Sequence, residues 1–213
     1  MKIVDLAHLL NSDITVYPGT EKPVFLQANT VEKDGFAELK MTMYTHTGTH
    51  IDAPSHMLKQ GKSLDQISPE NFIGKAICID CSGIKEKYIE QEHLEPFAKK
   101  IEQADFVLLR TDWSKKWKTN DYFRNFPVLS KVACSWLINF ELKGVGLDVI
   151  SIDPVDDTLD LINHRIVLGK GMVIIENLTN LDLIGDELFT FSCLPLKIEN
   201  ADGSPVRAIA ILE

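Results

Sequence analysis

The sequence lacks an apolar run long enough to span a bilayer, and it contains no internal repeat and no low-complexity segment. Its first residues, MKIVDLAHLLNSD, also lack the basic and then apolar order of a signal peptide. These absences argue against a membrane protein or an exported one, so the cytoplasm is the expected location. At 213 residues the chain is long enough for one sizeable core, and we expect a single domain over residues 1–213.

Positive charge is also scarce, because 22 Lys and Arg residues face 31 Asp and Glu residues, for a net charge of -9. A surface that binds a nucleic-acid duplex needs clustered Lys and Arg. The densest basic patch here is SKKWK at residues 114–118, which we interpret as a solvated loop. We therefore expect no nucleic-acid or membrane partner, and a small molecule as the substrate.

Cysteine is limited to four residues, and two of them, Cys78 and Cys81, have the C-x-x-C spacing of some zinc and redox sites. No second C-x-x-C completes a structural zinc site. The surrounding KAICIDCSG is typical of a buried strand, in which residues three apart point to opposite faces. We expect free thiols in a reducing cytosol. A redox enzyme is the least expected class, since no G-x-G-x-x-G follows a strand.

Strand patterns outnumber long helical patterns. The alternation in FAELKMTMYTH predicts a strand that ends near His46, and DFVLLRTDW, VGLDVIS and GMVIIENL are short apolar runs typical of interior strands. Two strand-like runs around NADGS predict a hairpin. These patterns predict an α/β fold in which a mixed, barrel-like β-sheet is flanked by helices.

Two segments show helical patterns. LSKVACSWLINFELKG predicts a helix that is capped by Ser130 and followed at its end by Gly144. IEQEHLEPFAKKIEQA has helical spacing, with Pro96 placed in the first turn. The segment SDITVYPGTEKPVF, with its prolines and glycine, is predicted to be irregular.

The stretch HTGTHIDAPSH, from His46 to His56, contains three of the six histidines and one aspartate. Its threonines, glycine and proline disfavour a helix, so it does not fit a helical zinc motif. We expect a tight turn at Gly48 and then an extended arm, where His50 and Asp52 point to the same side. Imidazole with carboxylate suits zinc or manganese. The crowding favours metal binding or catalysis over the alternative, in which these histidines are ordinary core or surface residues.

Two later segments supply further candidate ligands. His164 lies before one apolar run, and Glu176 ends the run GMVIIE. An ionised carboxylate at the end of a buried strand is costly unless a positive group meets it, and a metal, an arginine or a helix N-terminus would serve. Asp148 lies inside another apolar run, and spacing does not decide whether it is a ligand, a support for the ligands or a loop anchor.

The residues HTGTHIDAPSH resemble the H-x-G-T-H-x-D-x-P-x-H signature of the putative cyclase family, which includes bacterial kynurenine formamidase. The segments LLRTDW, GVGLDVISID and HRIVLGKGMVIIENLTNL resemble later family blocks in the same order, so the likeness covers most of the chain. The resemblance implies a fold of the swivelling β/β/α type. It also implies a divalent-metal hydrolase that forms a dimer or a larger oligomer.

The resemblance implies roles for particular residues. By position, the matching metal ligands are His46, His50, Asp52, His164 and Glu176, with Asp52 and Glu176 as bridges between two metals. His56 matches the proton donor and acceptor. Ser151 falls in the D-x-x-S block and is expected near the site, with Asp148 as a further support.

Two positions depart from the family pattern. The first loop reads VYPG, so Tyr17 stands where the formamidases have a tryptophan that stacks on the aromatic substrate. Tyrosine can still stack on an aromatic ring. The segment RTDW carries Asp112 where a glycine is often found. Both changes weaken the assignment to N-formylkynurenine itself.

The activity that the resemblance implies is hydrolysis of a C–N amide bond, most like an arylformamidase of tryptophan catabolism that converts N-formylkynurenine to kynurenine and formate. One or two divalent ions per subunit, zinc before manganese, would supply hydroxide, and His56 would relay a proton to the leaving nitrogen. Two alternatives stay open. One is a hydrolase that opens a cyclic amide, imide or lactone, similar to isatin hydrolase, and the other is a metal- or metabolite-binding protein without turnover.

Overall fold

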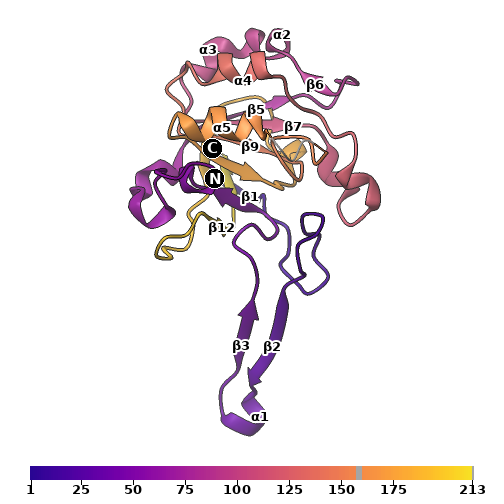
Figure 1. Ribbon diagram of the computed structural model, residues 1–213, viewed down its shortest axis with the longest axis vertical. Coiled ribbons are helices and arrows are strands. Elements are labelled where there is room, and N and C mark those ends of the chain that lie inside the picture. The colour runs from indigo at the N-terminus through magenta and orange to yellow at the C-terminus, as the bar shows by residue number, and fades with distance from the viewer. Residues whose placement is uncertain (157–159, 213) are drawn as a thin grey trace.

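The computed structural model describes residues 1–156 and 160–212, and its main element is a nine-stranded mixed sheet that curls into a half-barrel (Figure 1). In spatial order the strands are β1 (Lys2–Asp5), β13 (Ile209–Leu212), β11 (Phe189–Ser192), β5 (Ile73–Asp80), β7 (Phe106–Arg110), β9 (Gly144–Leu147), β10 (Val173–Glu176), β4 (His50–Asp52) and β12 (Gly203–Pro205). The four central strands from β5 to β10 run parallel, and the strands on either side pair antiparallel. The predicted fold class is confirmed.

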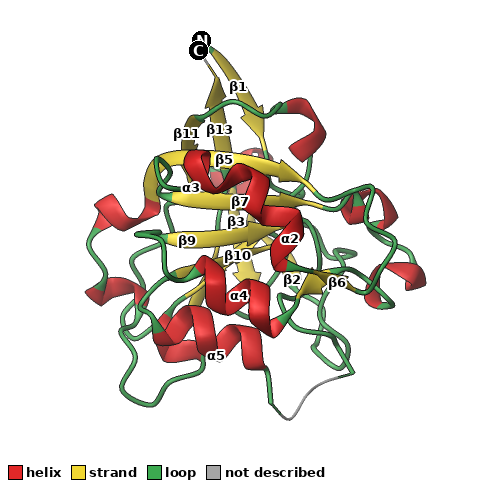
Figure 2. Ribbon diagram, turned by 90° about the horizontal axis from the view of Figure 1, so that it is seen from above, coloured by secondary structure: helices red, strands yellow, loops and turns green. Residues whose placement is uncertain are grey.

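Helices cover one face of this sheet (Figure 2). They are α2 (Gln91–Leu94), α3 (Ala98–Ile101), α4 (Lys131–Leu137) and α5 (Ile162–Gly169). Successive side chains of a strand point to opposite faces, so the central strands contribute to two cores. Ile77 and Ile79 of β5 pack with the helices, whereas Ala76 and Cys78 belong to the core on the opposite face.

The two cysteines of the C-x-x-C pair lie in different cores, Cys78 on one face of the sheet and Cys81 on the other. All four cysteines are free and buried. Burial raises the pKa of the Cys78 and Cys81 thiols to about 12, so both are held in the protonated form that binds metals poorly. The expectation of free thiols is confirmed.

Short elements complete the body of the molecule. Strand β6 (Tyr88–Ile89) pairs in parallel with β8 (Val128–Leu129). The 3-10 helices are η1 (Pro54–His56), η2 (Leu64–Gln66), η3 (Pro69–Phe72), η4 (Glu95–Phe97), η5 (Trp113–Lys116), η6 (Asn120–Phe123) and η7 (Leu181–Leu183). Among the described residues, no helix has the length and apolar character that a membrane crossing requires.

A two-stranded arm projects far from the body (Figure 1). It consists of β2 (Val24–Asn29) and β3 (Glu38–Thr42), with the short helix α1 (Val31–Asp34) at its tip. The prediction that this strand continues to a point near His46 is wrong, because β3 ends at Thr42. The following residues turn toward the sheet, where the Thr47 hydroxyl donates to the Tyr44 carbonyl over 2.8 Å.

Both helix predictions are correct in place and wrong in extent. Ser130 caps α4 by accepting a hydrogen bond from the Ala133 N–H, but the helix ends at Leu137 and Gly144 begins β9. After the helix the chain turns, with the Phe140 N–H donating to the Leu137 carbonyl, and Lys143 N then donates to the Asp105 carbonyl beside β7. Pro96 lies in the middle of its segment and divides it into α2, η4 and α3, since proline removes a helical N–H donor.

The predicted hairpin around NADGS does not form. The residues before it carry no strand, and its last two residues, Gly203 and Ser204, begin β12, which pairs with β4 instead of folding back on the preceding run. Asn200 has a φ of 58°, so the chain turns sharply at that point. This long-range pairing brings Asp202, the residue before β12, next to the stretch from His46 to His56.

Candidate metal centre

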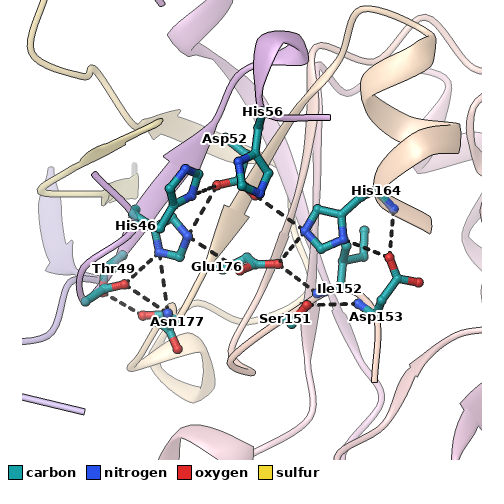
Figure 3. Close-up of polar contacts among 12 residues, drawn as sticks. His46, Thr49, Asp52, His56, Ser151, Ile152, Asp153, His164, Glu176 and Asn177 are labelled. Atoms are coloured by element: carbon teal, nitrogen blue, oxygen red, sulfur yellow. Dashed lines mark hydrogen bonds and ion pairs between the residues drawn. The ribbon is translucent and has the colours of Figure 1, made fainter. Parts of the chain in front are cut away.

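Four of the predicted ligands converge on one cavity of about 470 Å³. Strands β4 and β10 pair with His50 opposite Glu176, and His50 and Asp52 lie two apart in β4, so both point to the same side. His164 reaches the same place from helix α5 (Figure 3). All four side chains are buried.

The fifth predicted ligand, His46, reaches the group through the tight turn at Gly48. Gly48 has a φ of 68°, and a Cβ there would lie 2.8 Å from a side-chain carbon of Ile14. This turn places His46 Nδ1 2.7 Å from Asp52 Oδ1. Gly203 leaves room for the ring, because a Cβ at that position would lie 2.6 Å from the imidazole.

Both Asp52 and Glu176 face His50 with one carboxylate oxygen and His164 with the other. His50 Nε2 lies 3.3 Å from Asp52 Oδ1 and 3.5 Å from Glu176 Oε2. His164 Nε2 lies 3.4 Å from Glu176 Oε1 and 3.8 Å from Asp52 Oδ2. Two groups of donor atoms are therefore close enough to hold an ion each, namely His46, His50 and Asp52, and Asp52, His164 and Glu176. A carboxylate shared between two such groups has the arrangement of a bridge.

Hydrogen bonds hold the Nε2 atoms of two histidines toward the cavity. His164 Nδ1 lies 2.7 Å from Asp153 Oδ2, and the same oxygen accepts the His164 backbone N–H. His50 Nδ1 donates to the Gly48 carbonyl over 2.8 Å. In proteins, partners of this kind set the tautomer and the orientation of metal-binding histidines. Asp153 was not singled out from the sequence, although it ends the apolar segment VISID.

His56 lies at the edge of the cavity, at the end of η1, where its Nδ1 is 3.3 Å from Asp202 Oδ2. The same carboxylate oxygen lies 3.0 Å from His46 Nε2, and Asp202 Oδ1 accepts a hydrogen bond from the Thr45 hydroxyl. His46, His56 and Asp202 form a third group whose donor atoms lie close together, and it is more exposed than the other two. Sequence reasoning missed Asp202 because it assigned that segment to a hairpin turn.

The cavity concentrates buried negative charge. Burial alone would lower the pKa of His46, but the carboxylates of Asp52 and Asp202 raise it to about 10. Burial likewise opposes the charged form of His164, yet hydrogen bonds to Asp153 and Glu176 raise its pKa to about 10. The pKa of the Asp52 carboxyl lies well below its usual range, since the neighbouring imidazoles outweigh the cost of burial. The site therefore attracts cations, and its nitrogen and oxygen donors suit a divalent transition metal.

The remaining sequence candidates lie at different distances from this cluster. Tyr17 and Ser151 line the cavity. Burial and the nearby Glu176 carboxylate raise the pKa of the Tyr17 hydroxyl, and the Ser151 hydroxyl accepts a hydrogen bond from the Asp153 N–H. Asp148 lies outside the cavity, where its carboxylate accepts hydrogen bonds from the Thr111 N–H and hydroxyl at 2.9 and 2.5 Å. That arrangement is a loop anchor.

Asp112, the second departure from the family pattern, has a φ of 60°, which explains why glycine suits this position. It binds Arg110 Nε over 2.7 Å and lies outside the cavity. Other residues line the cavity without having been singled out from the sequence: Thr20, Tyr44, Thr45, Ile150, Leu161 and Asn177. Asn177, Thr45 and Ile150 had a signal, since they adjoin the candidates Glu176, His46 and Ser151, whereas Thr20, Tyr44 and Leu161 adjoin none of the candidates.

Comparison with known proteins identifies relatives over almost the whole chain. The family profile described as "Putative cyclase" matches residues 4–154. Kynurenine formamidase from Bacillus thuringiensis (strain Al Hakam) is 35% identical over 207 residues, which cover 97% of this chain and 95% of the relative.

Solved structures of isatin hydrolase A have the same fold. The enzyme from Labrenzia aggregata, bound to benzyl benzoate, superposes with a TM-score of 0.88 at 28% identity and covers 98% of this chain and 93% of its own. The enzyme from Ralstonia solanacearum superposes with a TM-score of 0.88 at 26% identity, over 100% and 92% of the two chains.

Proposed function

Because the chain belongs to the putative cyclase family, we propose that it is a metal-dependent hydrolase that cleaves a C–N amide bond, most like an arylformamidase. The observation that carries this proposal is the buried cluster in which Asp52 and Glu176 each face both His50 and His164. Such a cluster of carboxylates and imidazoles is costly to bury unless a cation neutralises it.

Five side chains would hold the metal, and they are His46, His50, Asp52, His164 and Glu176. We propose zinc before manganese, since both accept this mixture of nitrogen and oxygen donors. When bound, a divalent ion supplies an acidified water at neutral pH and polarises a substrate carbonyl. Hydrolysis adds one water across the amide bond and releases a carboxylate and an amine.

His56 would move the proton. The Asp202 carboxylate can only accept a hydrogen bond, so His56 Nδ1 carries the hydrogen in the neutral ring and Nε2 keeps its lone pair. In this form Nε2 takes a proton from the attacking water and returns it to the leaving nitrogen. Asp202 would hold the ring in the orientation that makes both transfers possible.

Tyr17 would contact the aromatic part of the substrate. It lines the cavity on the side of Glu176, and a tyrosine ring can stack on an aryl group. N-formylkynurenine is the first candidate substrate, through the name of the curated relatives, and this would place the enzyme in tryptophan catabolism. The second candidate is a cyclic amide such as isatin, which the solved structures favour. The free, buried cysteines are consistent with a reducing compartment, so we propose the cytoplasm.

A substrate panel on metal-free and reloaded protein tests this function. Chelator-treated protein is expected to lose all turnover, and Zn²⁺ or Mn²⁺ should restore it, because no side chain in the cluster replaces the Lewis acid. The panel contains N-formylkynurenine, N-formylaniline, isatin and a simple lactone, each followed by absorbance. We expect the highest kcat/KM on the formyl amides. A protein with stoichiometric metal and no turnover on any of the four would instead be a metal-binding protein.

We propose further that the arm formed by β2 and β3 joins two copies of this chain. A two-stranded hairpin is at best marginally stable alone in water. The arm nevertheless exposes six large apolar side chains, namely Val24, Leu26, Val31, Phe36, Leu39 and Met41. Exposed apolar surface gathered on one element is typical of an interface. Two residues that line the cavity adjoin the arm in the sequence: Thr20 lies shortly before β2 and Tyr44 shortly after β3. A contact between the arms of two copies would therefore also order the mouth of the cavity.

Replacing both Leu39 and Met41 with lysine tests the arm. The two side chains lie on the same face of β3, so the double variant places two charges in the proposed interface. Sedimentation equilibrium is expected to give a dimer or larger species for the wild type and a monomer for the variant. Val132→Lys on α4, also an exposed apolar residue, is the matched control and should leave the mass unchanged. A monomeric wild type, or an unchanged mass for the double variant, would contradict the proposal.

A further inference from the structure

Asn177 joins the two strands that carry the candidate ligands. It directly follows Glu176, it is buried, and its side-chain Nδ2 donates to the Gly48 carbonyl over 2.9 Å. We infer that Asn177 is a positioning residue that fixes the His50 imidazole through the Gly48 carbonyl, an inference that rests on the metal centre proposed above.

The Gly48 carbonyl accepts two hydrogen bonds at once. One comes from His50 Nδ1 at 2.8 Å and the other from Asn177 Nδ2 at 2.9 Å. The two donor nitrogens lie 3.5 Å apart because both converge on one oxygen. A carbonyl cannot donate, so His50 Nδ1 carries the hydrogen, and in the neutral ring Nε2 is the nitrogen that keeps a lone pair for a metal in the cavity. The position of this carbonyl therefore decides which nitrogen of His50 is available to a metal.

Only an amide meets the demands of this position. Asn177 has a φ of 57°, a region that asparagine adopts more readily than most residues. Its Nδ2 must donate to Gly48, while its Oδ1 accepts a hydrogen bond from the Tyr122 hydroxyl over 2.8 Å. An aspartate would keep the acceptor and lose the donor, so two oxygens would face each other across the contact with Gly48.

Backbone contacts hold Asn177 itself in place. Its N–H donates to the Val149 carbonyl over 3.0 Å, and its carbonyl accepts a hydrogen bond from the Thr49 hydroxyl over 2.6 Å. Thr49 lies between Gly48 and His50, so two separate bonds tie the turn to Asn177. The backbone bonds survive a change of side chain, which lets a substitution test the amide alone.

Tyr122 is the last residue in the series of hydrogen bonds that runs from His50 through Gly48 and Asn177. It is fully buried, and its hydroxyl donates to Asn177 Oδ1. Tyr122→Phe removes only that hydroxyl, and it leaves the residues around the cavity unchanged. The effect of this variant on His50 should therefore pass through Asn177.

The decisive experiment compares Asn177→Asp with Asn180→Asp. Asn180 is a matched control, because it has a φ of 58°, lies three residues later and donates through Nδ2 to the Asp5 carbonyl. Zn²⁺ affinity is measured by competition with a chromophoric chelator. Two-dimensional ¹H–¹⁵N NMR of the ring nitrogens reports the His50 tautomer in the metal-free protein. Asn177→Asp is expected to weaken zinc binding about 10- to 100-fold and to shift the ring-nitrogen signals of His50, because its carboxylate competes with the Gly48 carbonyl for the Nδ1 hydrogen.

Asn180→Asp should change neither readout, and Tyr122→Phe should weaken zinc binding about fivefold, the effect of one hydrogen bond. A folded Asn177→Asp protein with wild-type zinc affinity and an unchanged His50 signal would overturn the inference. If Asn177→Asp does not fold, Tyr122→Phe decides, and wild-type behaviour on both readouts would overturn it. If the wild type binds no zinc, the proposed function fails, and the tautomer in metal-free protein still tests Asn177.

Discussion

Glu176→Ala is expected to empty at least one of the two metal positions and to abolish turnover. The substitution removes one of the three donors in the group of Asp52, His164 and Glu176, and it also removes the oxygen that faces His50 in the other group. Changes to residues that support ligands cost about 10- to 100-fold in metal affinity, and loss of Glu176, a ligand in our proposal, should cost more. Elemental analysis of purified protein and chelator competition measure the effect, alongside kcat/KM on the best substrate of the panel.

The control for this variant is Asp182→Ala, which removes an exposed carboxylate from η7 a few residues further along the chain. It should keep metal and activity at wild-type levels. Glu176→Ala also leaves the Ile152 N–H without its acceptor, so thermal unfolding must show that the variant is folded. A folded Glu176→Ala protein with unchanged metal content would exclude Glu176 as a ligand.

His56→Ala is expected to separate metal binding from catalysis. The variant should keep the metal content of the wild type, because the five side chains that we propose as ligands do not include His56. Its kcat should fall about 10²- to 10⁴-fold, the contribution of a positioned proton donor and acceptor. Steady-state kinetics and elemental analysis on the same preparation provide both measurements.

His93→Ala is the matched control for this experiment, since that histidine accepts a hydrogen bond from the Glu90 N–H at the start of α2, among the helices. It should retain both metal and turnover. If His56→Ala loses its metal, then His46, His56 and Asp202 act as a ligand group and the proton-transfer role is wrong. If kcat is unchanged, another group moves the proton.

Predictions from the sequence succeeded where a local rule governs the structure. Alternation in a strand is enough to place His50 and Asp52 on one side, and it also separates Cys78 from Cys81. The cap at Ser130 depends on contacts within three residues, and it is present as expected. Predictions failed where the next element in space decided the outcome, as at the end of α4 and in the segment around Asp202.

The stretch from His46 to His56 was sufficient to indicate a metal site and to exclude a helical one, because glycine, proline and threonine act on their own backbone. Its environment depends on residues far away in the chain. Asp202 lies 156 residues from His46 and comes into contact through the pairing of β12 with β4, and Asn177 lies 129 residues from Gly48. Such contacts form only when distant strands pair, and no local pattern records which strands will meet. The tertiary structure therefore decided which carboxylates and amides surround the histidines.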